Sequence, residues 1–125
     1  MVASPMTYPA ATRAGLAMLG GRDIHVDTAT GRVRGHHWPA QRKAGAPVVI
    51  CPGFTEFCEK YADAAARLTA LGHDCLILDW PGQGRSGHLG ELALSVHIDD
   101  FEDHLAAADA LMVAVGFVAR PVIFL

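Results

Sequence analysis

Three short runs of large apolar residues, separated by two stretches with helical periodicity, constrain this chain more than any other feature. The runs are Val48–Cys51, Cys75–Leu78 and Pro121–Leu125. Strands that are apolar on both faces are typical of parallel sheets whose two sides are both covered by helices. The order of the runs and the periodic stretches therefore predicts a βαβαβ unit, an α/β fold with helices on both faces of its sheet.

The two stretches between these runs have the spacing of amphipathic helices. Apolar residues recur at three- and four-residue steps over 57–71, and Gly72 stands where a glycine commonly ends a helix. A second helix is predicted over 98–115. Its expected buried face consists of Ile98, Phe101, Leu105, Ala108, Met112 and Val115.

The front of the chain has a different pattern. Two strand candidates, Asp23–Asp27 and Arg32–Trp38, flank a short turn that ends in Gly31, which predicts a β-hairpin. Residues 1–21 are rich in Ala, Pro and Gly without a clear period, and we interpret them as a loose N-terminal segment. Residues 22–125 would then belong to one domain, of which they are expected to form only the N-terminal part.

Composition excludes several classes of protein. Hydrophobic residues make up 51% of the chain, which excludes disorder over most of its length. The chain has 10 Lys and Arg and 13 Asp and Glu. Because a protein that binds nucleic acid needs a basic face, nucleic acid is not an expected partner. The three cysteines are odd in number and lack CxxC spacing, which favours a reducing cytoplasm. The seven histidines form no ligand motif, so we expect neither a metal nor another cofactor.

Ligands of open parallel sheets bind beyond the carboxyl ends of the strands. Two loops leave those ends here, Pro52–Phe57 after the first buried strand and Asp79–Gly87 after the second. The second loop matches the dinucleotide pattern G-x-G-x-x-G over 82–87, but the helical period begins only near residue 98, so no helix N-terminus faces a pyrophosphate. A dinucleotide-binding oxidoreductase therefore stays as an alternative, as does a small non-catalytic α/β binding module.

Ser86 stands in a near match to the nucleophile motif G-x-S-x-G. The match fails at its last position, which is His88, and Ser86 lies seven residues past the acid that ends its strand. We expect Ser86 to hydrogen-bond its own loop backbone instead.

Together the two loops resemble a known family. Pro52-Gly53-Phe54-Thr55-Glu56-Phe57 is similar to the oxyanion-hole loop of α/β-hydrolases, and the second loop is similar to their D-x-x-G-x-G-x-S loop. The resemblance is to the lysophospholipase and monoacylglycerol-lipase-like branch, which is grouped with S33-type serine aminopeptidases. It extends from about Thr28 to Leu125.

The resemblance implies roles for individual residues. The Phe54 backbone N–H would be the first donor of the oxyanion hole, and Glu56 would brace its loop by hydrogen bonds rather than act as an acid. Asp79 would organise the glycine loop, since the catalytic acid of the family comes later in the chain. The residues expected to shape the two loops are Pro52, Gly53, Glu56, Asp79, Gly82, Gly84 and Ser86.

The resemblance also implies that the chain is the N-terminal part of the fold, truncated before the nucleophile elbow. The strand at 121–125 would run into that elbow, so the Ser-Asp-His triad would lie beyond Leu125. The longer protein would be a serine hydrolase of carboxylic esters, such as lysophospholipids or monoacylglycerols, acting through an acyl-enzyme. The chain alone would be inactive. The expected location is the cytoplasm, with peripheral contact to the inner membrane face left open, while head group, cap and oligomeric state are not predicted.

Overall fold

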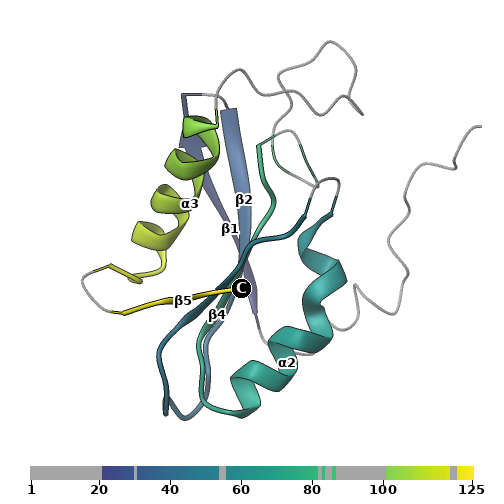
Figure 1. Cartoon of the computed structure of the whole chain (residues 1–125), viewed down its shortest axis with the longest axis vertical. Coiled ribbons are helices and arrows are strands. Elements are labelled where there is room, and N and C mark those ends of the chain that lie inside the picture. Colours follow the sequence, from purple (N-terminus) through teal and green to yellow (C-terminus); the bar gives the residue numbers. More distant parts are fainter. Residues whose placement is uncertain are drawn as a thin grey trace, which may run out of the picture.

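The computed structural model describes residues 21–29, 31–53, 56–81, 83, 86, 101–118 and 121–125. Within these ranges the chain forms a five-stranded sheet with α2 and α3 on opposite sides (Figure 1). The strands are β1 (Arg22–Thr28), β2 (Gly31–Trp38), β3 (Val48–Ile50), β4 (Cys75–Leu78) and β5 (Ile123–Phe124). The helices are the short 3-10 helix η1 (Cys58–Tyr61), α2 (Ala62–Ala70) and α3 (Glu102–Ala114).

The sheet is mixed and has the order β1-β2-β4-β3-β5. Because β3 pairs in parallel with both β4 and β5, the three predicted parallel strands are confirmed. The predicted hairpin is confirmed as β1 and β2. Its second strand also joins the sheet, since β2 runs antiparallel beside β4 and pairs Trp38 with Cys75. The hairpin thus covers the edge of β4 that the parallel strands leave unpaired.

Successive residues of the central strands face opposite helices, which explains why these runs are apolar throughout. The cluster on the α2 side contains Trp38, Val48, Ile50, Cys58, Ala62, Ala65, Cys75 and Ile77. The cluster on the α3 side contains Val33, Val49, Leu76, Leu78, Ala107, Ala108, Leu111 and Phe117. β3 and β4 therefore contribute alternate residues to two separate apolar clusters, one on each side of the sheet.

Both α-helices end at a glycine in the left-handed region. Gly72 has a φ of 97° and Gly116 a φ of 77°. In each case the glycine N–H and the next N–H bond back to the last turn, with His73 N–H reaching Leu68 O at 3.0 Å and Phe117 N–H reaching Met112 O at 2.8 Å. These are Schellman motifs. The predicted stop at Gly72 is therefore confirmed.

The predicted buried face of the second helix is wrong in part. In α3 the buried residues are Ala107, Ala108 and Leu111, whereas Phe101 is 79% exposed and Leu105 60% exposed. The helix turns its small residues to the sheet because it lies close to β2, where a Cβ on Gly35 would come within 3.2 Å of Leu111 Cδ2. A face of large side chains would hold the helix further away.

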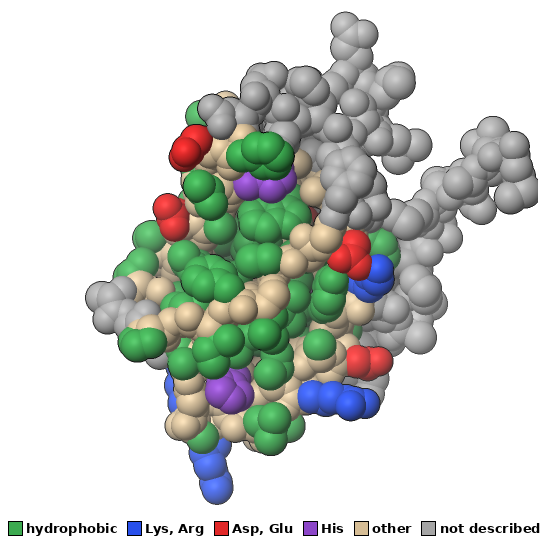
Figure 2. All heavy atoms as spheres, viewed as in Figure 1, with side chains coloured by type: hydrophobic (Ala, Val, Ile, Leu, Met, Phe, Trp, Pro, Cys, Tyr) green, Lys and Arg blue, Asp and Glu red, His purple; other side chains and the backbone are tan. Residues whose placement is uncertain are grey.

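The strand at the end of the chain is not buried on both faces, contrary to the prediction. β5 pairs with β3 along one edge, and Ile123 and Phe124 are 43% and 56% exposed. In the part of the chain that the structure describes, β5 is the outermost strand and no strand pairs with its other edge. Figure 2 shows hydrophobic side chains spread over the face where α3 and β5 lie. Large apolar side chains exposed on these two elements include Leu105, Val113, Ile123 and Phe124.

Candidate functional site

The two loops singled out in the sequence lie side by side. β3 and β4 are adjacent and parallel, with Ile50 opposite Ile77, so their carboxyl ends meet at one edge of the sheet. Cys51–Gly53 leaves β3 there, and Asp79 leaves β4. Of the predicted site residues, the structure describes Pro52, Gly53 and Glu56 in the first loop and Asp79 and Ser86 in the second. Phe54, Gly82 and Gly84 lie outside the described residues.

The carboxylate of Glu56 is the centre of the first loop. Its Oε1 accepts hydrogen bonds from the Gly53 N–H at 2.6 Å and from the Tyr61 hydroxyl at 2.7 Å, and its Oε2 contacts Lys60 Nζ. The hydrogen bonds from Lys60, Tyr61 and Gly53 lower the pKa of Glu56 to about 2. The group is therefore ionised at neutral pH, and it joins Gly53 at the start of the loop to Lys60 and Tyr61 of η1.

The absence of a side chain at Gly53 leaves room for this contact. A Cβ at this position would lie 2.7 Å from Glu56 Oε1, closer than real Cβ atoms approach an oxygen. The Glu56 N–H also returns to the Gly53 carbonyl at 3.2 Å, which closes a tight turn. Any side chain at position 53 would push the carboxylate away from the N–H that it accepts.

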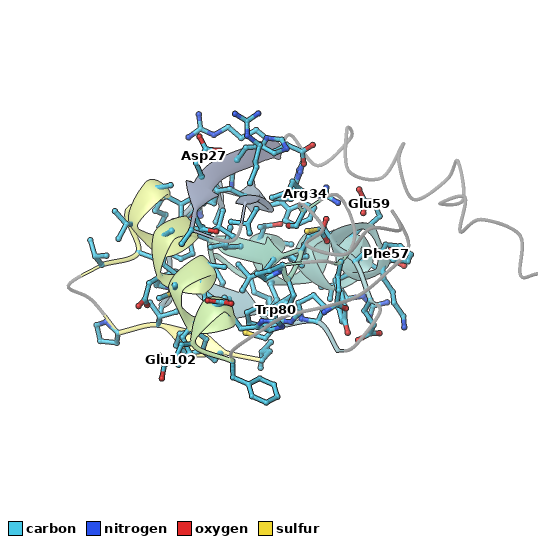
Figure 3. The ribbon with its side chains drawn as sticks, turned by 90° about the horizontal axis from the view of Figure 1, so that it is seen from above. Asp27, Arg34, Phe57, Glu59, Trp80 and Glu102 are labelled. Atoms are coloured by element: carbon cyan, nitrogen blue, oxygen red, sulfur yellow. The ribbon has the colours of Figure 1, made fainter. Side chains whose placement is uncertain are left out.

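Consecutive residues at the end of β4 hold the first loop at both of its ends. Trp80 Nε1 donates to the Pro52 carbonyl at 2.7 Å, at the start of the loop. Asp79 Oδ1 accepts the Cys58 N–H at 2.8 Å, at the start of η1. The Trp80 ring also stacks on His104 of α3, with ring centroids 4.8 Å apart, which secures the indole (Figure 3). The exit of β4 thus determines where the first loop sits.

Asp79 is itself held by a buried arginine that the sequence analysis missed. Arg34, on β2, donates from Nε to Asp79 Oδ2 at 2.7 Å and from Nη2 to both Glu59 oxygens at 2.9 and 3.0 Å. Its Nη1 reaches Asp23 Oδ1 at 3.1 Å. The side chains of Arg34, Glu59 and Asp79 are all fully buried. Burial works against the charge of Arg34, but the nearby carboxylates of Asp79 and Glu59 outweigh it and raise its pKa.

Ser86 bridges the hairpin and the end of β4. Its hydroxyl donates to the Asp79 carbonyl at 2.6 Å and accepts the Arg34 N–H at 2.9 Å. The residue is buried, at 3% exposure. With its proton given to a carbonyl, this hydroxyl is engaged in backbone contacts and is not presented as a nucleophile.

The sequence carried little signal for this cluster. Arg34 follows Arg32 and Val33 at a polar position of an alternating strand, where a solvent-facing side chain would be expected, and only the position of Glu59 and Asp79 beside apolar segments indicated buried charge. Buried charges are almost always paired, so a cation and two acids at buried positions indicate one another.

Among the described residues, no group of three or more His, Cys, Asp or Glu could hold a metal ion. No described helix is long and apolar enough to cross a membrane.

Comparisons with known proteins show sequence similarity to a hydrolase family. A family model described as serine aminopeptidase, S33, matches residues 42–123. Lysophospholipase L2 of Escherichia coli strain K12 is 48% identical over 58 residues, which are 46% of this chain and 17% of that protein. The sequence match thus spans about a sixth of the curated relative.

Solved structures show the same fold. An epoxide hydrolase from an endophytic Streptomyces superposes with a TM-score of 0.63 at 24% identity, covering 84% of this chain and 29% of the other. A soluble variant of monoglyceride lipase from Saccharomyces cerevisiae superposes with a TM-score of 0.66 at 15% identity, covering 82% and 34%. At these identities the likeness concerns the fold, a partial α/β-hydrolase fold in which this chain corresponds to about a third of each structure.

Proposed function

The chain belongs to the serine aminopeptidase S33 family of α/β-hydrolases, and on that premise we propose that it forms the amino-terminal part of a serine hydrolase of carboxylic esters. The observation that carries the proposal is the junction of the two loops, where Asp79 and Trp80 hold both ends of the loop after β3. This family membership also favours hydrolysis over the dinucleotide-dependent alternative. Activity is assigned to the longer protein, because this chain spans only part of its relatives.

In this proposal the first loop supplies one half of an oxyanion hole. Acyl transfer develops negative charge on the substrate oxygen, and backbone N–H groups that are already in place stabilise it without reorganisation. The Phe54 N–H is the proposed donor. The described contacts support a rigid start to this loop, because the Gly53 N–H and the Tyr61 hydroxyl both donate to the Glu56 carboxylate. One such donor contributes about 10²–10³-fold to kcat.

The nucleophile is assigned to the segment after β5. In this fold the serine stands on a sharp turn between a strand and a helix, followed in the chain by the acid and then the histidine. Ser86 is engaged with backbone groups of Asp79 and Arg34, so it is not the proposed nucleophile. The triad residues would then lie beyond Leu125, and residues 1–125 alone would not form an acyl-enzyme.

Lysophospholipids and monoacylglycerols are the proposed substrates. Support comes from the 48% identity to a protein named lysophospholipase L2 and from the fold shared with a monoglyceride lipase. The cytoplasm is the proposed location, with peripheral membrane contact during lipid hydrolysis. Three free cysteines fit a reducing compartment, since Cys58 and Cys75 are buried and Cys51 half-buried, and burial raises the pKa of each thiol.

A fluorophosphonate probe tests the proposal directly. The longer protein should be labelled at one serine beyond position 125, and residues 1–125 alone should not be labelled. Turnover of a lysophospholipid, a monoacylglycerol and an aminoacyl amide would then separate the ester hydrolase from a peptidase. Absence of labelling in a folded longer protein, or labelling of Ser86, would contradict the proposed function.

A further inference from the structure

The geometry points to Arg34 as a positioning residue for the proposed oxyanion-hole loop, an inference that rests on the proposed hydrolase function. Arg34 lies on β2, outside both loops, and its side chain is fully buried. No sequence motif of the two loops includes it. Its guanidinium nevertheless bonds to Asp79 and Glu59, the two residues that hold the start of η1, where the first loop ends.

Arg34 acts on that loop through two neighbouring residues. Both carboxylate oxygens of Asp79 accept hydrogen bonds. Oδ2 accepts from Arg34 Nε, and Oδ1 accepts from the Cys58 N–H. Glu59, which follows Cys58 in η1, accepts hydrogen bonds from Arg34 Nη2 on both of its carboxylate oxygens, and the same Nη2 lies 2.6 Å from Asp79 Oδ2. Rotation of the Asp79 carboxylate would therefore break either the Arg34 contact or the Cys58 contact. One planar cation thus fixes the position of Cys58 through Asp79 and that of Glu59 directly.

The planar shape of the guanidinium matters as much as its charge. Its donors point in fixed directions, so one arginine can orient carboxylates that come from different elements. Here they come from β1 (Asp23), η1 (Glu59) and the end of β4 (Asp79). Lysine at this position would keep the charge, but its three N–H donors all leave one nitrogen atom and cannot reproduce the planar fork of the guanidinium. The carboxylates would then settle in a different arrangement, and the start of η1 would move with them.

A displacement of the loop is expected to reduce turnover more than binding. Misplacement of a catalytic group by about 1 Å costs about 10²-fold in rate, because the donor no longer meets the developing oxyanion. Because the negative charge that this loop would stabilise develops only in the transition state, its displacement should change KM little. This separation of kcat from KM is what distinguishes a positioning role from a contribution to substrate binding.

The experiment uses the longer protein and compares two arginines of one strand. Arg34→Lys and Arg34→Gln are matched with Arg32→Lys and Arg32→Gln, because Arg32 also lies on β2 but makes an exposed ion pair with Asp27. Each variant is titrated to completion with a fluorophosphonate, and kcat is expressed per labelled site. We expect Arg34→Lys to be folded with kcat lowered about 10- to 100-fold and KM within about twofold. Both Arg32 variants should match the wild type.

Other outcomes overturn the inference. A wild-type kcat per labelled site in folded Arg34→Lys or Arg34→Gln would show that Arg34 does not position the loop. If Arg34→Gln fails to fold, Arg34→Lys decides, and failure of both to fold at any temperature would reduce Arg34 to a folding requirement. A wild-type protein that the probe does not label contradicts the proposed function instead, so the two failures are distinguishable.

Discussion

Replacement of Asp79 by asparagine tests the buried ionic cluster most sharply. The substitution keeps shape and volume, and the remaining amide oxygen can still accept the Cys58 N–H. The amide NH₂ would then face Arg34 Nε, 2.7 Å from the present Oδ2, so a hydrogen bond becomes a contact between two donors. The side chains of Arg34 and Asp79 are both fully buried, so water cannot solvate the part of the guanidinium that loses its carboxylate.

The expected loss of unfolding free energy is that of removing one charged partner from a buried ion pair. Removal of one partner costs about 3–5 kcal/mol, and we expect the free energy of unfolding of Asp79→Asn to fall by this amount. The matched control is Asp27→Asn, which removes an exposed ion pair with Arg32 and should cost less than about 1 kcal/mol. Urea unfolding gives both values from the shift in midpoint at constant m-value.

A double-mutant cycle completes the test. Arg34→Met combined with Asp79→Asn should cost much less than the sum of the two single changes, because each removes the same interaction. A loss below about 1 kcal/mol in Asp79→Asn, or additive costs in the double variant, would refute the assignment of Arg34 and Asp79 as a coupled buried pair.

Three further predictions concern the core, the first loop and pH. Leu111→Ala should cost about 2–5 kcal/mol of unfolding free energy and Leu105→Ala, on the exposed side of α3, about 0.5 kcal/mol or less, both measured in urea; equal costs would contradict the observed helix face. In the longer protein, Gly53→Ala should lower kcat at least about tenfold with little loss of stability, because the added Cβ displaces the Glu56 carboxylate; wild-type turnover would argue against the brace. Burial lowers the pKa of His36 in the folded state despite its hydrogen bond to a carboxylate, so the stability that this neutral histidine contributes is present above pH about 6.5 and declines as pH falls below it. His36→Gln should flatten the dependence of the urea midpoint on pH between about 7.5 and 5, and an unchanged slope would contradict this assignment.

Much of the fold was predictable because it is encoded locally. Four-residue apolar runs and three- and four-residue spacing determine β3, β4 and α2, and Gly72 ends that helix through contacts within five residues. The meeting of the two loops also follows from the sequence, since parallel strands must end at the same edge. Within the first loop, the bond between Gly53 and Glu56 spans three residues, which is why a motif can signal it.

Only the tertiary structure decided how that edge is held. Arg34 and Asp79 are 45 residues apart, and Arg34 and Glu59 are 25 apart, so no periodic pattern links them. They meet because β2 enters the sheet beside β4, a pairing that the sequence did not specify. The same holds for the buried face of α3, which depends on how closely the helix approaches Gly35. Local pattern thus determined the elements and their order, whereas the contacts between distant elements decided which charged groups are buried together and how they hold the loop.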